Sequence, residues 1–177
     1  DAPQKFAIGS DNRTYELQGN LDGRTFRDLY SVNMATGDRK LLKKQSQYAY
    51  QISPDGTKYY YYEAKHFFVV DLATNTPKNV TATIATSFVD SDDDHNVIDP
   101  PENPIGWTAD SNFLILSDGW DMWKVATDGS SATNLTVNGK KLQIRYRARL
   151  RVDADEKGID LGKTQYINWM EEWTKKQ

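Results

Sequence analysis

"ISPDGTKYYYY", residues 52–62, joins a strong turn signal to a run of tyrosines. The Ser-Pro-Asp-Gly segment at 53–56 suits the four positions of a type I turn, because proline fixes φ and glycine tolerates the conformation that follows. Tyrosine favours strands, where a large ring packs on a pleated surface. The stretch therefore predicts a turn followed by a strand over 58–63.

The turn recurs at a fixed spacing. "SPDG" at 53–56 aligns with "TADS" at 108–111, which is 55 residues later. The same offset relates two more pairs of segments, "HFFVV" (66–70) with "DMWKV" (121–125) and "NVT" (79–81) with "NLT" (134–136). Three landmarks share one offset, so chance is a poor explanation. The repeated Asn-x-Thr sequence favours a structural role at the end of each repeat over glycosylation.

A second spacing relates the first part of the chain to the same repeat. "DLYSVNMATG" (28–37) aligns with "HFFVVDLATN" (66–75) at an offset of 38 residues, 17 fewer than the later offset. The additional residues fall between Thr81 and Thr108, where an acidic stretch occurs. A weaker copy of the turn is "DADE" at 153–156. The repeat is therefore interrupted by one insertion.

Each repeat has the pattern of four short strands, which in the second repeat are 48–52, 58–63, 67–71 and 79–81. About 40 residues with four strands is typical of a β-propeller blade, and we rank this fold above a sandwich, which lacks repeated landmarks. The predicted fold class is all-β, a β-propeller fragment with about two complete four-stranded blades and two partial blades. The predicted divisions are a partial blade 1–46, a blade 47–82, an acidic insertion 83–104, a blade 105–139 and a partial blade 140–177.

The tyrosine strand has a defined place in this arrangement. Tyr59 and Tyr61 are expected to face one neighbouring blade, and Tyr60 and Tyr62 the other. Helix is expected only in the acidic insertion or in "EEWTKKQ" (171–177). Because a closed propeller has roughly 4–8 blades, we expect a fragment of a larger protein whose exposed edge strands allow self-association.

Composition excludes several classes of function. The formal net charge of -3 argues against an electrostatic nucleic-acid binder. No run approaches the roughly 18 apolar residues of a membrane span, and the polar start has no signal-peptide core. No cysteine is present, so disulfides and thiolate metal sites are excluded, and no cofactor is predicted.

No catalytic residue is predicted in this chain. The G-x-S-x-G sequence that raises a nucleophilic serine on a strained turn does not occur. The two histidines, His66 and His95, lie in different settings, and no motif places serine and acid partners beside either one.

The acidic insertion contains a candidate cation site. Asp90, Asp92 and Asp94 have the D-x-D-x-D spacing that begins a calcium loop. His95 and Pro101 stand where such a loop requires glycine and glutamate. We therefore favour a solvated acidic loop over a metal site.

An alternating basic stretch follows the third repeat. "RYRARLR" is expected to place Arg145, Arg147, Arg149 and Arg151 on one face of a strand. One interpretation is a row that borders the channel and binds acidic groups of a partner. The interpretation that we favour is a solvent-facing row that discourages edge pairing. Four close arginines repel one another unless carboxylates lie nearby, so the acidic insertion is a candidate partner.

The landmarks together resemble a known family. "DLYSVNMATG", "ISPDGTKYYYY", "GWTADSNFLILSDGWDMWKVATDG", "NLT" and "DADEKGID" resemble the N-terminal β-propeller of prolyl oligopeptidase family serine peptidases, especially large bacterial members. The resemblance covers about 27–161 most strongly. It implies a non-catalytic domain set over a C-terminal α/β-hydrolase domain, restricting access to the active site and contributing contacts to peptide substrate. It also implies a periplasmic or otherwise exported location.

Dipeptidyl members of this family use a glutamate pair on the propeller to hold the amino terminus of the substrate. By resemblance, "WMEEWTKK" offers Glu171 and Glu172 for this role, although the surrounding residues differ from the family pattern. The alternative function is a stand-alone repeat module that binds a protein, peptide or glycan through its loops. The two hypotheses differ in whether a hydrolase domain belongs to the parent chain.

Overall fold

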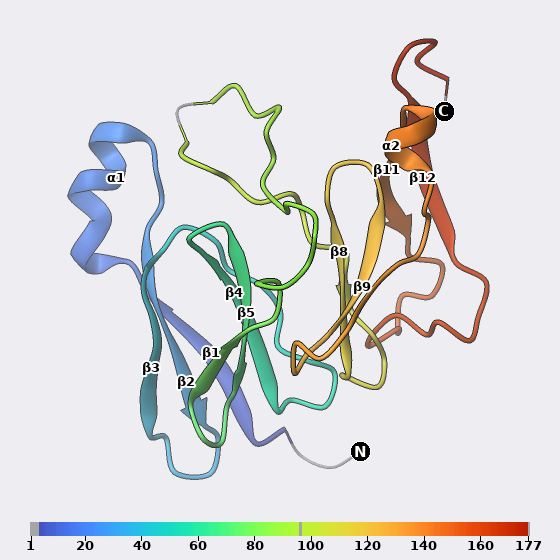
Figure 1. Cartoon of the computed structure of the whole chain (residues 1–177). Helices are drawn as coiled ribbons and strands as arrows, with labels where there is room; N and C mark the ends of the chain where they lie inside the picture. Colours follow the sequence, from blue (N-terminus) through green and yellow to red (C-terminus); the bar gives the residue numbers. More distant parts are fainter. Residues whose placement is uncertain (1–3, 96, 177) are drawn as a thin grey trace.

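The structure is a computed structural model that describes residues 4–95 and 97–176. These residues form four small antiparallel sheets that follow one another in chain order (Figure 1). The first sheet has the order β1-β2-β3 and the second β4-β5-β6. Their strands are β1 (Phe6–Asp11), β2 (Arg27–Asn33), β3 (Arg39–Ser46), β4 (Lys58–Glu63), β5 (His66–Asp71) and β6 (Thr76–Asn79).

The third sheet has four strands in the order β10-β9-β8-β7, and the fourth has two strands. Their bounds are β7 (Gly106–Trp107), β8 (Phe113–Ser117), β9 (Met122–Ala126), β10 (Ala132–Asn134), β11 (Ile144–Leu150) and β12 (Tyr166–Glu171). The all-β class is confirmed. The strand count differs from two complete four-stranded blades, because residues 47–82 supply three strands.

The missing strand is the one predicted at 48–52. These residues have no strand assignment, and the N–H of Tyr50 donates to the hydroxyl oxygen of Tyr59 at 3.0 Å. In a sheet this N–H would donate to a backbone carbonyl of a neighbouring strand, whereas here a side-chain oxygen accepts it. The last strand of this sheet is β6, which begins earlier than the predicted 79–81.

Helix occurs outside the two predicted places. The helical segments are η1 (Arg13–Tyr15), α1 (Glu16–Asp22) and α2 (Gly139–Leu142). The α1 helix forms in the β1–β2 connection and ends at Gly23, whose φ of +74° suits a left-handed cap. The described residues of the acidic insertion contain no helix, since aspartates and prolines oppose one there. No described helix is long and apolar enough to cross a membrane.

The core lies between successive sheets. One buried cluster joins Tyr59 and Tyr61 to Leu29 of β2, and a second joins Tyr60 and Tyr62 to Leu114 of β8. The predicted division of the tyrosines between two neighbours is therefore confirmed. A third cluster joins the third sheet to the fourth through Ile115, Met122, Tyr146, Ile159 and Ile167. Each sheet thus packs face to face with the next.

The 55-residue offset is also present in the hydrogen bonds of the turns. The hydroxyl of Ser53 donates to Asp55 at 2.6 Å, and the hydroxyl of Thr108 donates to Asp110 at 2.6 Å. The same hydroxyl oxygens accept the N–H of Lys58 and of Phe113, at 2.9 and 3.0 Å.

The Asn-x-Thr segments repeat in the same way. The side chains of Asn79 and Asn134 accept the N–H groups of Thr81 and Thr136, at 3.0 and 3.1 Å. The hydroxyl oxygen of Thr81 accepts the N–H of Phe67, and that of Thr136 accepts the N–H of Met122. Phe67 and Met122 are also 55 residues apart. The structural role predicted for this repeated sequence is confirmed.

Candidate functional site

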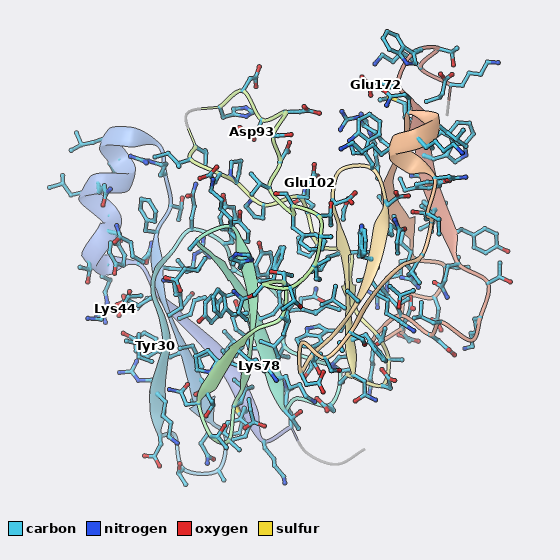
Figure 2. All side chains as sticks on the ribbon, viewed as in Figure 1. Tyr30, Lys44, Lys78, Asp93, Glu102 and Glu172 are labelled. Atoms are coloured by element: carbon cyan, nitrogen blue, oxygen red, sulfur yellow. The ribbon has the colours of Figure 1, made fainter. Side chains whose placement is uncertain are left out.

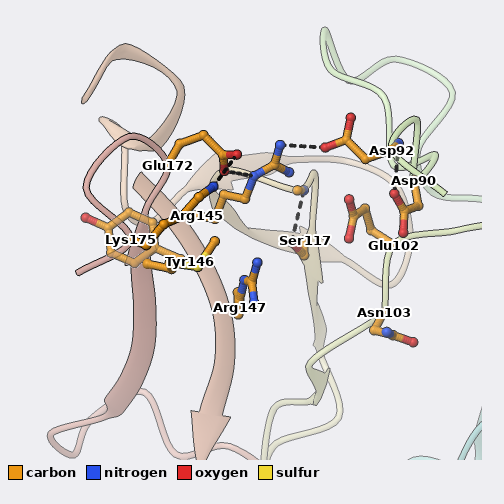
Figure 3. A pocket seen from close by; sticks show the side chains of 12 residues that line it. Asp90, Asp92, Glu102, Asn103, Ser117, Arg145, Tyr146, Arg147, Glu172 and Lys175 are labelled. Carbon is orange, nitrogen blue, oxygen red and sulfur yellow. Dashed lines mark hydrogen bonds and ion pairs between the residues drawn. The ribbon is translucent and has the colours of Figure 1, made fainter. Parts of the chain in front are cut away.

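A cavity of about 470 Å³ lies where three segments that are distant in the sequence meet (Figure 3). We call it the charged cavity, because ionisable side chains make up most of its lining. The acidic insertion supplies one wall, the β8–β9 turn a second, and the fourth sheet with the turn after it a third. The lining residues are Asp90, Asp92, Glu102, Asn103, Ser117, Gly119, Arg145, Tyr146, Arg147, Met170, Glu172 and Lys175.

The acidic insertion is fixed to the core at its base. Phe88 is 1% exposed and packs edge-on against Phe67, with ring centroids 6.2 Å apart. The N–H of Glu102 donates to the carbonyl of Phe88 at 2.9 Å, and the Tyr62 hydroxyl donates to the carbonyl of Asp99 at 2.8 Å. The interpretation as a solvated loop therefore holds only for the outer part, where Asp94 is 97% exposed.

Arg145 connects the insertion to the fourth sheet. Its guanidinium lies 4.2 Å from the ring centre of Trp120 and pairs with both Asp92 and Glu172. Lys175 adds a further pair with Glu172 at 2.9 Å, and hydrogen bonds from Lys175 and Arg145 lower the pKa of Glu172. The expectation that the insertion supplies an acidic partner to the arginines is confirmed at Arg145.

Glu102 lies opposite this chain of ion pairs. Burial raises the pKa of Glu102 to about 7, the nearby carboxylate of Asp90 adds to the shift, and Arg145 opposes it. Gly119 makes room for the carboxyl group, because a Cβ at Gly119 would stand 2.6 Å from the Oε1 atom of Glu102. Near neutral pH, Glu102 can therefore both accept and donate a hydrogen bond. Figure 2 shows Glu102 and Glu172 at the end of the molecule that carries the insertion.

The four arginines of "RYRARLR" do not share one face. Arg145 pairs across the sheet with Met170, and Arg149 pairs with Ile167. Met170 and Ile167 are three residues apart on one strand, so they point to opposite faces, and so do their partners. The physical reason is a bulge between Tyr146 and Ala148, which shifts the alternation by one residue.

The favoured interpretation of a solvent-facing row is also wrong for two of the arginines. The side chains of Arg145 and Arg149 are 18% and 15% exposed. Arg149 pairs with Glu156, whereas Arg151 donates to backbone carbonyls that include that of Asp153. Arg147 is exposed and lines the charged cavity. Whether any of the four binds a partner stays a prediction.

The other predicted site residues are separated. Within 4–95 and 97–176 the structure has no group of three or more acidic, histidine or cysteine side chains that could hold a metal ion, so Asp90, Asp92 and Asp94 do not form one. Asp90 and Asp92 line the charged cavity. Of the glutamate pair, Glu172 lines the charged cavity and Glu171 does not; Glu171 instead accepts a hydrogen bond from Thr174.

The two histidines are likewise apart. The Nδ1 atom of His66 lies 3.2 Å from the hydroxyl of Thr81, at the end of a strand. His95 lies in the outer part of the insertion, with its Nδ1 atom 3.3 Å from Asp93. Neither residue lines the charged cavity.

The fold of this chain has similarity among solved structures. A scan against protein families and a search of curated proteins found no match. The chain is similar to TolB from Acinetobacter baumannii, known from a crystal structure, with 12% sequence identity and a TM-score of 0.43. The similarity covers 76% of this chain and 31% of the TolB chain.

Sequence reasoning missed the part of the charged cavity built by the β8–β9 turn. Asp118 accepts the N–H groups of Trp120 and Asp121, at 3.0 and 2.7 Å, and so fixes the turn that presents Gly119. The signal was present as "SDGWD" (117–121), since Asp-Gly between two strands marks a tight turn. No local sequence pattern marked Glu102 as a residue of the cavity, because its burial depends on how the acidic insertion folds back onto the core.

Proposed function

We propose that this chain is a β-propeller-type repeat segment without catalytic residues, and that it binds peptide at the charged cavity. The observation that carries the proposal is the packing of four small sheets face to face in chain order, with the charged cavity at one end. Propeller blades are stacked in this way, and repeat proteins bind ligands through loops gathered on one side.

The chemistry of the charged cavity favours a peptide. Carboxylates of Asp90 and Asp92, a protonatable Glu102 and the guanidinium of Arg147 offer acceptors and donors within one space. A peptide presents both N–H donors and carbonyl or carboxylate acceptors, so it complements such a mixture. Glu172 takes part by holding Arg145 and Lys175 in place.

Isothermal titration of the 177-residue chain with short peptides tests this function. We expect the binding of an amidated peptide to weaken on Asp92→Asn, because this change removes a carboxylate acceptor for peptide N–H groups and frees Arg145 from the insertion. Lys78→Gln is a control, since Lys78 is an exposed residue of β6 outside the lining of the charged cavity. If no peptide binds, or if both variants weaken binding equally, the proposed function is wrong.

We further propose that the parent protein is a prolyl oligopeptidase-like serine peptidase, exported from the cell, in which this segment restricts access to a hydrolase domain and contacts peptide substrate. The support is the set of sequence landmarks quoted above. Reading the coding sequence downstream of Gln177 tests it: we expect G-x-S-x-G followed by aspartate and histidine. A stop codon there would favour the stand-alone module, for which self-association through edge strands remains the prediction.

A further inference from the structure

Arg147 differs from the other cations that line the charged cavity. Arg145 is paired with Asp92 and Glu172, and Lys175 is paired with Glu172. For Arg147 the described part of the chain offers no ion-pair or hydrogen-bond partner, although carboxylates line the same space. A guanidinium has five N–H donors, and within residues 4–95 and 97–176 none of those of Arg147 is used.

The backbone directs Arg147 to this position. Tyr146 pairs with Trp169 and Ala148 with Asn168, so Arg147 is the additional residue of a β-bulge. Bulges re-aim one side chain, and they are frequent beside binding sites. In Figure 3, Arg147 lies on the side of the cavity opposite Asn103 and Glu102.

The surroundings select the kind of anion that Arg147 can bind. A planar guanidinium matches a carboxylate through two parallel hydrogen bonds. Asp90, Asp92 and Glu102 line the same cavity. They repel a phosphate dianion more strongly than a carboxylate with a single charge. Oδ1 of Asp90 already accepts the N–H of Asp92, and Oδ2 of Asp92 pairs with Arg145, but each of these carboxylates keeps a second oxygen that can accept an N–H group of the same ligand.

We propose that Arg147 binds a carboxylate group of the peptide, supplied by its C-terminus or by an acidic side chain. This inference rests on the proposed function. The ligand group in the charged cavity is then a carboxylate, and the bulge in β11 serves to direct Arg147 toward it.

Isothermal titration with four matched peptides tests the inference. The peptides share one neutral sequence and carry a free C-terminus, an amidated C-terminus, an amidated C-terminus with one glutamate, or an amidated C-terminus with one phosphoserine. The native chain is compared with Arg147→Gln, Arg147→Lys and the control Arg13→Gln. Arg13 is an exposed arginine that pairs with Asp11 outside the charged cavity. Far-UV circular dichroism checks that each variant is folded.

We expect the native chain and Arg13→Gln to bind at least one carboxylate peptide about tenfold more tightly than the amidated neutral peptide. Arg147→Gln should remove this preference and retain the weaker binding, and Arg147→Lys should keep part of it. The peptide that is preferred identifies the source of the carboxylate.

Two results would overturn the inference and leave the proposed function intact: an unchanged preference in Arg147→Gln, or tightest binding of the phosphoserine peptide. Absence of binding by all four peptides would overturn both.

Discussion

Glu102 lies half-buried among carboxylates, and this placement makes the stability of the chain depend on pH. Burial raises its pKa from 4.5 to about 7. The folded state therefore holds the proton more tightly than the unfolded state. As pH rises from about 4.5 to about 7, the unfolded chain loses this proton first, and the folded state becomes relatively less stable.

The Glu102→Gln variant has a neutral side chain at every pH, so its free energy of unfolding should not fall as pH rises from about 4.5 to about 7. The full shift corresponds to about 3 kcal/mol, and solvent screening of this half-exposed group reduces it, so we expect the variant to be more stable than the native chain above about pH 7 by about 2 kcal/mol, with the difference vanishing below about pH 4.5. Urea unfolding of both proteins across this range measures the difference. A constant difference at all pH values would show that Glu102 titrates at its ordinary pKa.

The tyrosines of β4 differ in what their hydroxyl groups do. The hydroxyl oxygen of Tyr59 accepts the N–H of Tyr50 at 3.0 Å. Tyr59→Phe leaves that N–H without a partner next to the core, so we expect a loss of about 1–2 kcal/mol. Tyr61→Phe is the matched control on the same face, because no described residue hydrogen-bonds to its hydroxyl. Equal losses in urea unfolding would contradict the role of the Tyr59 hydroxyl.

The repeated turn between strands depends on one buried hydroxyl group, that of Thr108. Thr108 donates to Asp110 and accepts the N–H of Phe113. Thr108→Val keeps the shape and loses both bonds, so we expect a destabilisation of about 1–2 kcal/mol. Thermal unfolding measures it against Thr83→Val, which alters an exposed threonine of the insertion. A Thr108→Val loss no larger than that of Thr83→Val would mean that the turn does not need its hydroxyl.

Sequence patterns predicted those elements that local chemistry determines. The 53–56 turn and the β4 strand follow from residues within one segment, and the repeat then locates β8 and β9. The prediction from simple alternation was wrong for β11, because the bulge moves the side chains that follow it to the other face of the strand. The residue types in the segment do not reveal the bulge. The prediction of a strand at 48–52 was wrong, because the N–H of Tyr50 bonds to the hydroxyl of Tyr59 and not to the backbone of a neighbouring strand.

The acidic insertion is a structural part of the core, because Phe88 belongs to the cluster between the second and third sheets. Phe88 is 1% exposed, whereas Ile98 in the same insertion is 86% exposed. Phe88→Ala opens a cavity between the second and third sheets, and we expect a loss of about 3–5 kcal/mol. Ile98→Ala should change the free energy of unfolding by less than about 0.5 kcal/mol. Similar values for both in urea unfolding would place the insertion outside the cooperative unit.

The order of the sheets could be read from the repeat, whereas the charged cavity could not. Its walls come from residues 90–92 and 102–103, 117–119, 145–147 and 170–175, which meet only after the insertion folds back over the second sheet. Acidic and basic stretches indicated that some pairing would occur. They did not indicate which carboxylate pairs with Arg145, or that Arg147 has no ion-pair partner among the described residues, because both depend on the register of β11 and β12.

We propose that the charged cavity is the place where this chain binds peptide. Chemical-shift mapping of the 15N-labelled chain during titration with a carboxylate peptide tests it most directly. We predict that the largest shifts fall on the amides of Asp90, Glu102, Gly119, Arg147 and Glu172, whereas β6 and the first sheet stay unchanged. Shifts centred on the first sheet, or no shifts at all, would contradict the claim.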